Sequence, residues 1–410
     1  RHGTPAPRRT VPPMERLPDV IVVGAGIFGL AAALELHAGG RAVTVVDDGP
    51  LPRPLGASTD ISKVVRIEYG RDEEYMALAE RARDGWLRWN AEWFGEPLYH
   101  EVGLLLVSGA PMVPGDYLHD SYYRLLARGH RPERLSSADI AARWPAIRAG
   151  ACADGYLNPE AGYVESGRVI EALGREAGRA GVAFHGGAPV RELVERSGRV
   201  TGVRLGDGTV LGAGETVLAT GAWTPGLVPE LAAVMRSVGQ PVFHLAPADP
   251  AAYAAPRLPV VSADSARTGW YGFPAHPRTG VVKIANHGPG WPVDPVRDPR
   301  VVPEAYVPRL RAFLADTLPG LADAPIVYTR CCLYCDTPDE HFWIARHPGR
   351  AHLTVAAGDS GHGFKFGPVL GAVIADAVDG RANAYLDKFR WREIPTGTVG
   401  QEGSRYRGAG

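Results

Sequence analysis

The sequence predicts an α/β fold in which a doubly wound dinucleotide-binding domain is joined to a second domain rich in β-strands. Three observations lead to this prediction. A strand, a glycine-rich turn, a helix and a second strand follow one another over residues 19–48. The length of 410 residues suits two domains. Residues 241–299 alternate Pro, Gly and short apolar runs, which is typical of β-rich structure.

The first predicted unit is a βαβ arrangement. Residues 19–23 form a short apolar run of the kind that makes a buried parallel strand. The motif Gly-Ala-Gly-Ile-Phe-Gly at 24–29 follows directly, and strong helix formers at 30–36 predict a helix. A second apolar run at 42–46 predicts the next parallel strand. This context is the one that a dinucleotide-binding fingerprint requires.

Each conspicuous residue of this unit has a physical role. Gly24 allows the tight turn, Gly26 lets the backbone approach a pyrophosphate, and Gly29 lets the helix pack closely on the strand. The N-terminus of the helix offers unpaired N–H groups to the phosphates. Asp47 follows Gly24 by 23 residues, where an acid can bind a ribose hydroxyl. The alternative is a tight βαβ turn that binds no dinucleotide.

Several classes of protein are excluded by composition. The net charge of -1 gives no basic surface for nucleic acid or an anionic membrane. No apolar run approaches the roughly 20 residues that a membrane helix needs. Residues 1–13 are basic and Pro-rich without an apolar core, so they are not a secretory signal. Four unevenly placed cysteines suit a reducing compartment, which predicts a cytoplasmic protein.

Two C-terminal segments carry the most specific signal. They are Cys332-Leu-Tyr-Cys-Asp-Thr-Pro-Asp-Glu and Gly358-Asp-Ser-Gly-His-Gly-Phe-Lys-Phe. Together they resemble the monomeric sarcosine oxidase group of the D-amino-acid-oxidase-like flavoproteins. That group also contains N-methyltryptophan, pipecolate and fructosyl-amino-acid oxidases. The resemblance runs from about residue 19 to about residue 389 and includes the segments 219–223 and 271–274.

The resemblance implies FAD, joined to a cysteine through a thioether at the flavin 8α-methyl group. The cysteine that matches the motif is Cys332. One alternative for the cysteine cluster is a small buried core patch, and another is a metal or redox pair of Cys332 with Cys335. No second Cys-x-x-Cys or suitable histidine pair supports zinc, so no metal is expected. The expected cofactor-binding residues are Gly24, Gly26, Gly29, Asp47, Lys63, Val190, Gly221, Trp223, Cys332, Gly361, His362, Gly363 and Lys365.

The same resemblance implies a carboxylate clamp formed by Arg66 and Lys365. Two fixed cations on one side of the flavin would orient an amino-acid substrate, and Arg can do so through two parallel hydrogen bonds. The alternative is that either residue forms a surface ion pair, with Glu68 or with Asp359. The position of Lys63 is occupied by an arginine in sarcosine oxidase and by a lysine in fructosyl-amino-acid oxidases. The sequence therefore combines the signatures of both groups.

Lysine is rare in this chain, occurring only at positions 63, 283, 365 and 388. The position of Lys283 resembles the family lysine that promotes the reaction with oxygen, since a cation stabilises the charge that develops as O2 is reduced. The alternative is a strand-end lysine that reaches solvent. Tyr271 and His287 match positions that line the substrate pocket, although His287 also fits a structural histidine. The expected catalytic residues are Lys283, Arg66, Lys365, Tyr271 and His287.

The implied enzyme oxidises a secondary amine or imino group in an amino-acid-like substrate. Hydride passes to flavin N5, an imine forms, and O2 as co-substrate is reduced to hydrogen peroxide. Fructosyl-amino-acid oxidation, an amine dehydrogenase with another electron acceptor, a flavoprotein without turnover and a nicotinamide-only dehydrogenase remain alternatives. The resemblance suggests a monomer without nucleic-acid or membrane partners. The expected domains are a discontinuous FAD-binding domain at 14–95, 150–235 and 325–390, and an antiparallel-sheet substrate domain at 96–149 and 236–324, with 1–13 and 396–410 disordered.

Overall fold

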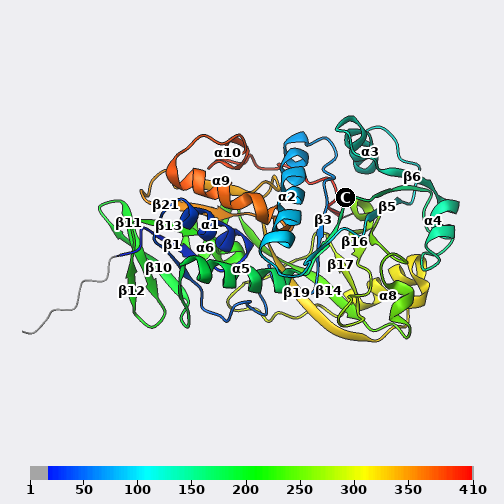
Figure 1. The fold of residues 1–410 in the computed structure, drawn as a ribbon, viewed down its shortest axis with the longest axis horizontal. Helices are drawn as coiled ribbons and strands as arrows, with labels where there is room; N and C mark the ends of the chain where they lie inside the picture. The colour runs from blue at the N-terminus through cyan, green and yellow to red at the C-terminus, as the bar shows by residue number, and fades with distance from the viewer. Residues whose placement is uncertain (1–16, 409–410) are drawn as a thin grey trace, which may run out of the picture.

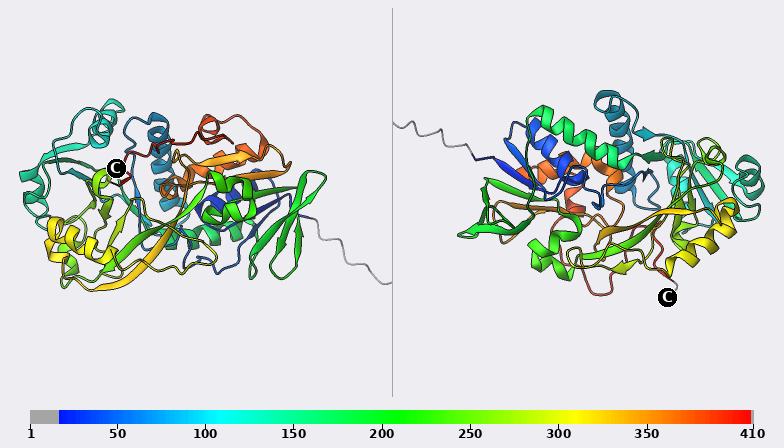
Figure 2. Two further views of the ribbon diagram at one scale, coloured as in Figure 1. Left: turned by 180° about the vertical axis from the view of Figure 1, so that it is seen from behind. Right: turned by 90° about the horizontal axis from the view of Figure 1, so that it is seen from below.

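The computed structural model describes residues 17–408 and confirms the α/β class, with a parallel sheet in one part and a large, mostly antiparallel sheet in the other (Figure 1). The prediction for residues 1–13 lies outside the described residues. The two parts lie side by side along the long axis, and both views in Figure 2 show them joined by long strands.

The first part is built on a six-stranded sheet. The apolar runs around the glycine motif form β1 and β2, which pair in parallel, and the helix between them is α1. All other neighbours in the sheet are parallel too, except the pair β20–β21. In order across the sheet, the strands are β20 (Trp343–Arg346), β21 (Leu353–Ala357), β13 (Glu215–Leu218), β1 (Val20–Val23), β2 (Val43–Val46) and β9 (Ala183–His185).

This sheet is covered differently on its two faces. Val20 and Val22 pack with the helices α1 (Ile27–Ala38), α5 (Ser166–Ala180) and α9 (Gly367–Asp379). Ile21 and Val23 point the other way, because successive residues of a strand alternate between faces. They pack against an antiparallel meander of β10 (Val190–Arg196), β11 (Arg199–Leu205) and β12 (Val210–Gly212). The second face is thus covered by strands, whereas a doubly wound sheet carries helices there.

The second part is built on a nine-stranded sheet. Its longest strands, β14 and β19, pair antiparallel over almost their whole length. Only β15 and β5 pair in parallel. The strands are β18 (Trp291–Pro292), β14 (Arg236–Leu245), β17 (Val282–Asn286), β16 (Trp270–Gly272), β15 (Val260–Ala263), β5 (Leu104–Ser108), β7 (Asp154–Asn158) and β6 (Glu133–Ser136), with β19 (Ile326–Asp336) on β14.

A small sheet and further helices complete the fold. The three-stranded sheet consists of β3 (Lys63–Val65), β8 (Gly162–Val164) and β4 (Tyr99–His100). The long helix α2 (Glu73–Glu92) packs along α9, with Trp86 and Trp89 in the core. The remaining helices are α3 (Tyr117–Ala127), α4 (Ser137–Arg143), α6 (Thr224–Leu227), α7 (Ser265–Thr268), α8 (Tyr306–Thr317) and α10 (Leu386–Phe389). Among the described residues, no helix combines the length and apolar character needed to cross a membrane.

The predicted substrate-domain ranges, 96–149 and 236–324, supply most strands of the nine-stranded sheet. Two of its strands come from ranges expected in the FAD-binding domain. These are β7, which pairs with β5, and β19, which pairs with β14. The C-terminal end of β19 reaches the six-stranded part, where Cys335 packs with Ile21 and Val23, so the chain crosses between the parts within this strand.

The prediction that the C-terminal residues from 396 onward are disordered is wrong for the segment that the structure describes. Glu402, Ser404 and Arg405 are only 4%, 6% and 6% exposed. Buried charged side chains are found where they are paired, and these residues have partners on distant elements. The segment lies between α2 and the nine-stranded sheet (Figure 1).

The packing of α1 on the glycine turn predicts the effect of Gly29→Ala. A Cβ at Gly29 would lie 1.8 Å from the carbonyl oxygen of Gly24, so the helix must move away from the turn. We expect the free energy of unfolding to fall by about 3 kcal/mol or more. Chemical denaturation followed by circular dichroism measures this change.

Gly178→Ala is the matched control, because Gly178 also lies in a helix but has open space around its Cβ position. This variant should be stabilised by up to about 1 kcal/mol. Equal stability of the two variants would contradict the close-packing role of Gly29.

Candidate active site

A long groove runs over the glycine turn at the carboxyl ends of β1 and β2. Its lining includes Gly24, Gly26, Asp47 and Val190, and also Gly221 and Trp223 at the end of β13. The backbone of Gly24 and of Gly221 has positive φ, at 102° and 50°, which glycine adopts without steric cost. The sequence-predicted dinucleotide residues are therefore brought together along one groove.

Asp47 and Ser58 hold the glycine turn in place. The Asp47 carboxylate accepts hydrogen bonds from the backbone N–H of Ala25 at 2.8 Å and of Gly49 at 3.1 Å. The Ser58 hydroxyl accepts from the N–H of Ile27, the first residue of α1, at 3.0 Å. A Cβ at Gly26 would lie 3.1 Å from the same hydroxyl, so the turn and residue 58 approach each other closely.

Gly29 and Gly363 are the two expected cofactor residues that do not line the groove or the cavities beyond it. A Cβ at Gly363 would lie 2.8 Å from the ring of Phe28 and 2.9 Å from Asp359. Both glycines therefore act through close packing behind the groove.

A second cavity connects the groove to the centre of the molecule. It shares Gly26, Ser58 and Gly221 with the groove. It shares Lys63, Cys332, Tyr334, Gly361 and Phe364 with a central pocket on its other side. The shared residues show that the cavities form one continuous path. This path suits a dinucleotide that lies along the groove with a ring system at its inner end.

The register of β19 decides which cysteine faces this path. Cys332 and Tyr334 pack on one side of the strand with Val238, Val242 and Ala285. Cys331 and Leu333 point to the other side, next to Val293. Burial raises the pKa of the Cys331 thiol to about 11. Cys335 belongs to yet another core cluster, and among residues 17–408 no group of three metal-ligating side chains is close enough to hold an ion.

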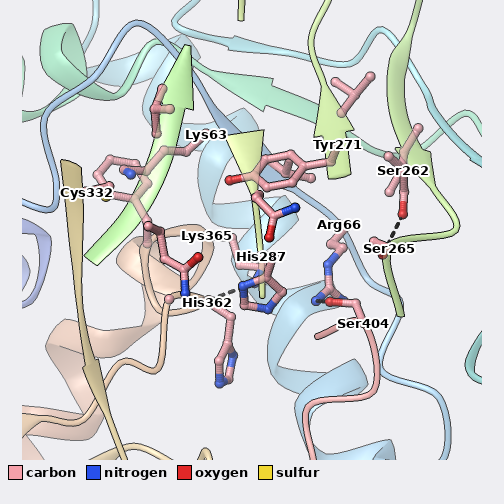
Figure 3. A pocket seen from close by; sticks show the side chains of 18 of the residues that line it. Lys63, Arg66, Ser262, Ser265, Tyr271, His287, Cys332, His362, Lys365 and Ser404 are labelled. Carbon is pink, nitrogen blue, oxygen red and sulfur yellow. Dashed lines mark hydrogen bonds between the residues drawn. The ribbon is translucent and has the colours of Figure 1, made fainter. Parts of the chain in front are cut away.

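The central pocket collects the predicted substrate-site residues from several strands and loops (Figure 3). Lys63 and Cys332 lie toward the connecting cavity, while Arg66 and Ser404 lie beside each other farther in. The pocket lining contains all of the expected catalytic residues: Arg66, Tyr271, Lys283, His287 and Lys365.

Lys283 is held on the pocket wall by Asp60. Its Nζ lies 2.5 Å from Asp60 Oδ2 and donates to the carbonyl oxygen of Ser62 at 2.5 Å. Burial alone would raise the pKa of Asp60, but Lys283 and His244 hold it well below its usual value. Burial lowers the pKa of Lys283 to about 8, although Asp60 opposes this shift. Lys283 is 2% exposed, which excludes the alternative of a strand-end lysine in solvent.

Lys365 begins a chain of hydrogen bonds through Tyr69 to His362. Lys365 Nζ donates to the Tyr69 hydroxyl at 2.8 Å and to the His362 carbonyl at 2.7 Å. The Tyr69 hydroxyl lies 3.0 Å from His362 Nδ1, and His362 Nε2 donates to the carbonyl of Glu340 at 2.9 Å. Burial, and then the charge of Lys365, lowers the pKa of His362, so this histidine is neutral and accepts at Nδ1.

Arg66 forms a buried ion pair with Glu402. Arg66 Nη2 lies 2.6 Å from Glu402 Oε1 and donates to the Ser404 hydroxyl at 2.9 Å. Burial alone would raise the pKa of Glu402, but Arg66 and His287 hold it well below its usual value. The alternative, a surface ion pair of either residue with Glu68 or Asp359, does not form among the described residues. Arg66 and Lys365 are buried, and Arg66 donates to the backbone carbonyl of Glu68.

His287 and Tyr271 both line the pocket (Figure 3). His287 Nε2 lies 2.9 Å from Glu402 Oε2, and its Nδ1 lies 3.2 Å from the Tyr334 hydroxyl. Burial lowers the pKa of His287 despite Glu402. Tyr271 lies beside Phe273 and completes the apolar side of the pocket.

Sequence reasoning missed Asp60, Tyr69, Glu402 and Ser404. Asp60 stands close in sequence to Lys63 and Arg66, so a search for an acid near these predicted site residues, to pair with Lys283, was the available signal. Glu402 stands in a polar, glycine-containing tail, and no local pattern distinguishes it from a solvated residue.

Comparison with known proteins agrees with this geometry. Residues 19–377 match the family described as FAD dependent oxidoreductase. L-saccharopine oxidase of Schizosaccharomyces pombe is 29% identical, over 91% of this chain and 93% of the relative. Monomeric sarcosine oxidase of a Bacillus species is 28% identical, over 90% and 95%. The crystal structure of fructosyl amine:oxygen oxidoreductase (Amadoriase I) from Aspergillus fumigatus superposes with a TM-score of 0.79 at 27% identity, covering 94% of this chain and 93% of that one.

The matched region contains the glycine turn, the groove and the pocket lysines Lys283 and Lys365. The fold, the connected cavities and the family match therefore agree, and the chain belongs to the FAD-dependent oxidoreductase family.

Proposed function

We propose that this protein oxidises a secondary amine or imino group of a small organic substrate, using FAD and passing the electrons to O2 to form hydrogen peroxide. The observation that carries the proposal is the central pocket, which joins the dinucleotide groove through a cavity lined by Cys332 and Lys63. Named relatives that oxidise sarcosine, N-methyltryptophan and saccharopine support the same reaction class.

The residues present fit FAD. The groove over Gly24 and Gly26 suits the adenosine and pyrophosphate, with Asp47 at the ribose position. The connecting cavity is lined by Cys332, Tyr334 and Gly361, and a Cβ at Gly361 would lie 2.1 Å from the Tyr334 ring. Bound FAD would supply the acceptor for a hydride from the carbon next to the substrate nitrogen and a route for its electrons to O2.

The protein contributes placement and charge to this reaction. The substrate amine must bind unprotonated, because its lone pair drives the loss of hydride. Lys63 lines the pocket and has no carboxylate within ion-pair distance among the described residues, so it disfavours a bound ammonium ion. Lys283 supplies the cation for O2 reduction, and the network of Lys365, Tyr69 and His362 holds one wall in position.

Fructosyl-amine oxidation is a second candidate. Lys63 is the residue that favours it, because the fructosyl enzymes share a lysine there, and the fold superposes on Amadoriase I. An amine dehydrogenase that passes its electrons to an acceptor other than O2 is less favoured. The reason is that Lys283 is buried in the pocket wall, where a cation would assist O2 reduction. A monomeric state and a cytoplasmic location stay predictions.

The reaction class predicts that purified protein releases peroxide with at least one amine of a small panel. The panel contains sarcosine, N-methyl-L-tryptophan, L-pipecolate, saccharopine and fructosyl-lysine, each with a carboxylate-free analogue where one exists. Peroxide is measured by a peroxidase-coupled dye, and added catalase must abolish the signal. Anaerobic bleaching of the flavin without peroxide would indicate a dehydrogenase, and no bleaching with any amine would contradict the proposal.

Replacing Lys283 by Met should slow flavin reoxidation by O2 about 100-fold, because one fixed charge opposite the developing anion is lost. In the unsubstituted enzyme the rate should fall as pH rises through about 8, where Lys283 loses its proton, and the variant should lack this dependence. Stopped-flow absorbance of the reduced flavin measures both effects. Lys388→Met is the control, since Lys388 pairs with Asp72 and Glu74 away from the pocket. Unchanged reoxidation in Lys283→Met would refute this role.

We further propose a thioether between FAD and Cys332. Cys332→Ala should release its flavin when the protein is denatured in acid, whereas the unsubstituted protein and Cys331→Ala should retain it, because Cys331 faces away from the cavities. Absorbance of the supernatant after precipitation distinguishes the two results. Release from the unsubstituted protein would show that the link is absent.

A further inference from the structure

The C-terminal strap, defined as residues 400–407, forms part of the central pocket. Ser404 lines the pocket, and Figure 3 shows its backbone passing beside the Arg66 guanidinium. The strap comes from a region 336 residues away from Arg66 in the sequence, as the Arg66–Glu402 hydrogen bond records. Its side chains therefore reach the pocket only through the tertiary fold.

The strap uses the hydrogen-bonding capacity that a substrate carboxylate would need. Arg66 Nη2 donates to Glu402 and Ser404. Arg66 Nη1 donates to the Glu68 carbonyl and to the Tyr117 hydroxyl. A guanidinium has five N–H groups, and a bidentate carboxylate contact needs two parallel ones. With both terminal nitrogens engaged, only Nε–H is left. Arg66 therefore has no two parallel N–H groups free to bind a substrate carboxylate.

Lys365 does not restore the clamp. Two of its three N–H groups already point at Tyr69 and at the His362 carbonyl. The remaining N–H of Lys365 can make one hydrogen bond, which does not match the two oxygens of a carboxylate as an arginine does. Burial and the neighbouring charge of Arg66 both lower the pKa of Lys365, so its positive charge is itself disfavoured in this pocket.

The strap is fastened by contacts beyond Arg66, which makes it a wall and not a transient cover. Arg405 makes a two-pronged ion pair with Asp336, at 3.0 and 2.5 Å. Arg407 pairs with Glu340, whose carboxylate also accepts the backbone N–H of Glu402 at 2.9 Å. Displacing the strap would expose or unpair the buried charges of Asp336, Glu340 and Arg405, which is costly.

Two glycines allow this close fit. A Cβ at Gly400 would lie 2.1 Å from the Glu340 carboxylate, and one at Gly403 would lie 2.7 Å from the Tyr117 ring. Any other residue at these positions would push the strap away from the pocket.

We propose that Glu402 supplies the carboxylate partner of Arg66 from within the chain, so that the preferred substrates are secondary amines without a carboxylate next to the reacting nitrogen. Glu402 is then a specificity-determining residue: it neutralises the cation that would select amino acids. This inference rests on the proposed amine oxidase function and narrows its substrate class.

The test compares matched amines with the holoenzyme. The pairs are dimethylamine with sarcosine, N-methyltryptamine with N-methyl-L-tryptophan, and piperidine with L-pipecolate. One of these pairs should be turned over. For the unsubstituted enzyme we expect kcat/KM in that pair to be about tenfold or more higher for the amine without a carboxylate than for its partner. Glu402→Ala should reverse this preference, mainly by lowering KM for the carboxylate member, because Arg66 is then unpaired. Glu402→Gln, which keeps the side-chain shape, is the second variant, and Glu393→Ala, at an exposed acid of the same terminal region, is the control.

Calorimetric titration with acetate provides a readout that needs no turnover. Acetate should bind Glu402→Ala about tenfold or more tightly than the unsubstituted protein or Glu393→Ala, since it can occupy the position of the missing carboxylate. Equal acetate affinity in all three proteins would overturn the inference. So would an unsubstituted enzyme that prefers the carboxylate member of its pair, whatever Glu402→Ala does. Silence with every amine and no flavin bleaching would contradict the proposed function, and the acetate titration would still decide the role of Glu402.

Discussion

The arrangement of this protein's centre depends on the requirement that buried charges be paired. Arg66 and Lys283 both lie in the pocket wall, and each has an acid from another part of the chain within ion-pair distance. An unpaired buried charge costs several kcal/mol, and removing one partner of such a pair typically destabilises a protein by about 3–5 kcal/mol. Glu402 and Asp60 therefore have a structural task as well as an electrostatic one. They allow buried cations to line the central pocket.

The pairing has different consequences at the two cations. At Lys283, Asp60 opposes the effect of burial, so the pKa falls only to about 8. The lysine can thus remain cationic on the wall of a cavity. At Arg66 the acid takes up hydrogen-bonding capacity too, because Glu402 and Ser404 reach the guanidinium together. One acid neutralises its cation on the pocket wall, and the other also occupies the hydrogen-bond donors of its cation.

The pair of long strands β14 and β19 is the frame that brings these features together. Their register places Cys332 opposite Gln240 and Tyr334 opposite Val238, so the cysteine and the tyrosine share one face. Lys283 on β17 pairs with His244 on β14, which in turn lies 3.2 Å from Asp60. A slip of one residue would turn Cys332 away from the cavity and Cys331 toward it. The positions of Cys332, Tyr334 and Lys283 in the site are therefore set by strand register.

The sequence by itself determined the parts whose physics is local. The strand, turn and helix around Gly24 and Gly29 depend on short-range sterics and on apolar runs, and the alternation along β19 follows from the pleat. The proposed roles of Lys283 and Cys332 rest on a resemblance that the sequence carries, and they stay predictions. Tertiary structure alone decided that strands cover the second face of the parallel sheet, and that the C-terminal strap lies in the pocket. The physical reason is that burial of a charge is a property of the whole fold: Glu402 resembles any solvated acid until Arg66, His287 and Ser404 surround it.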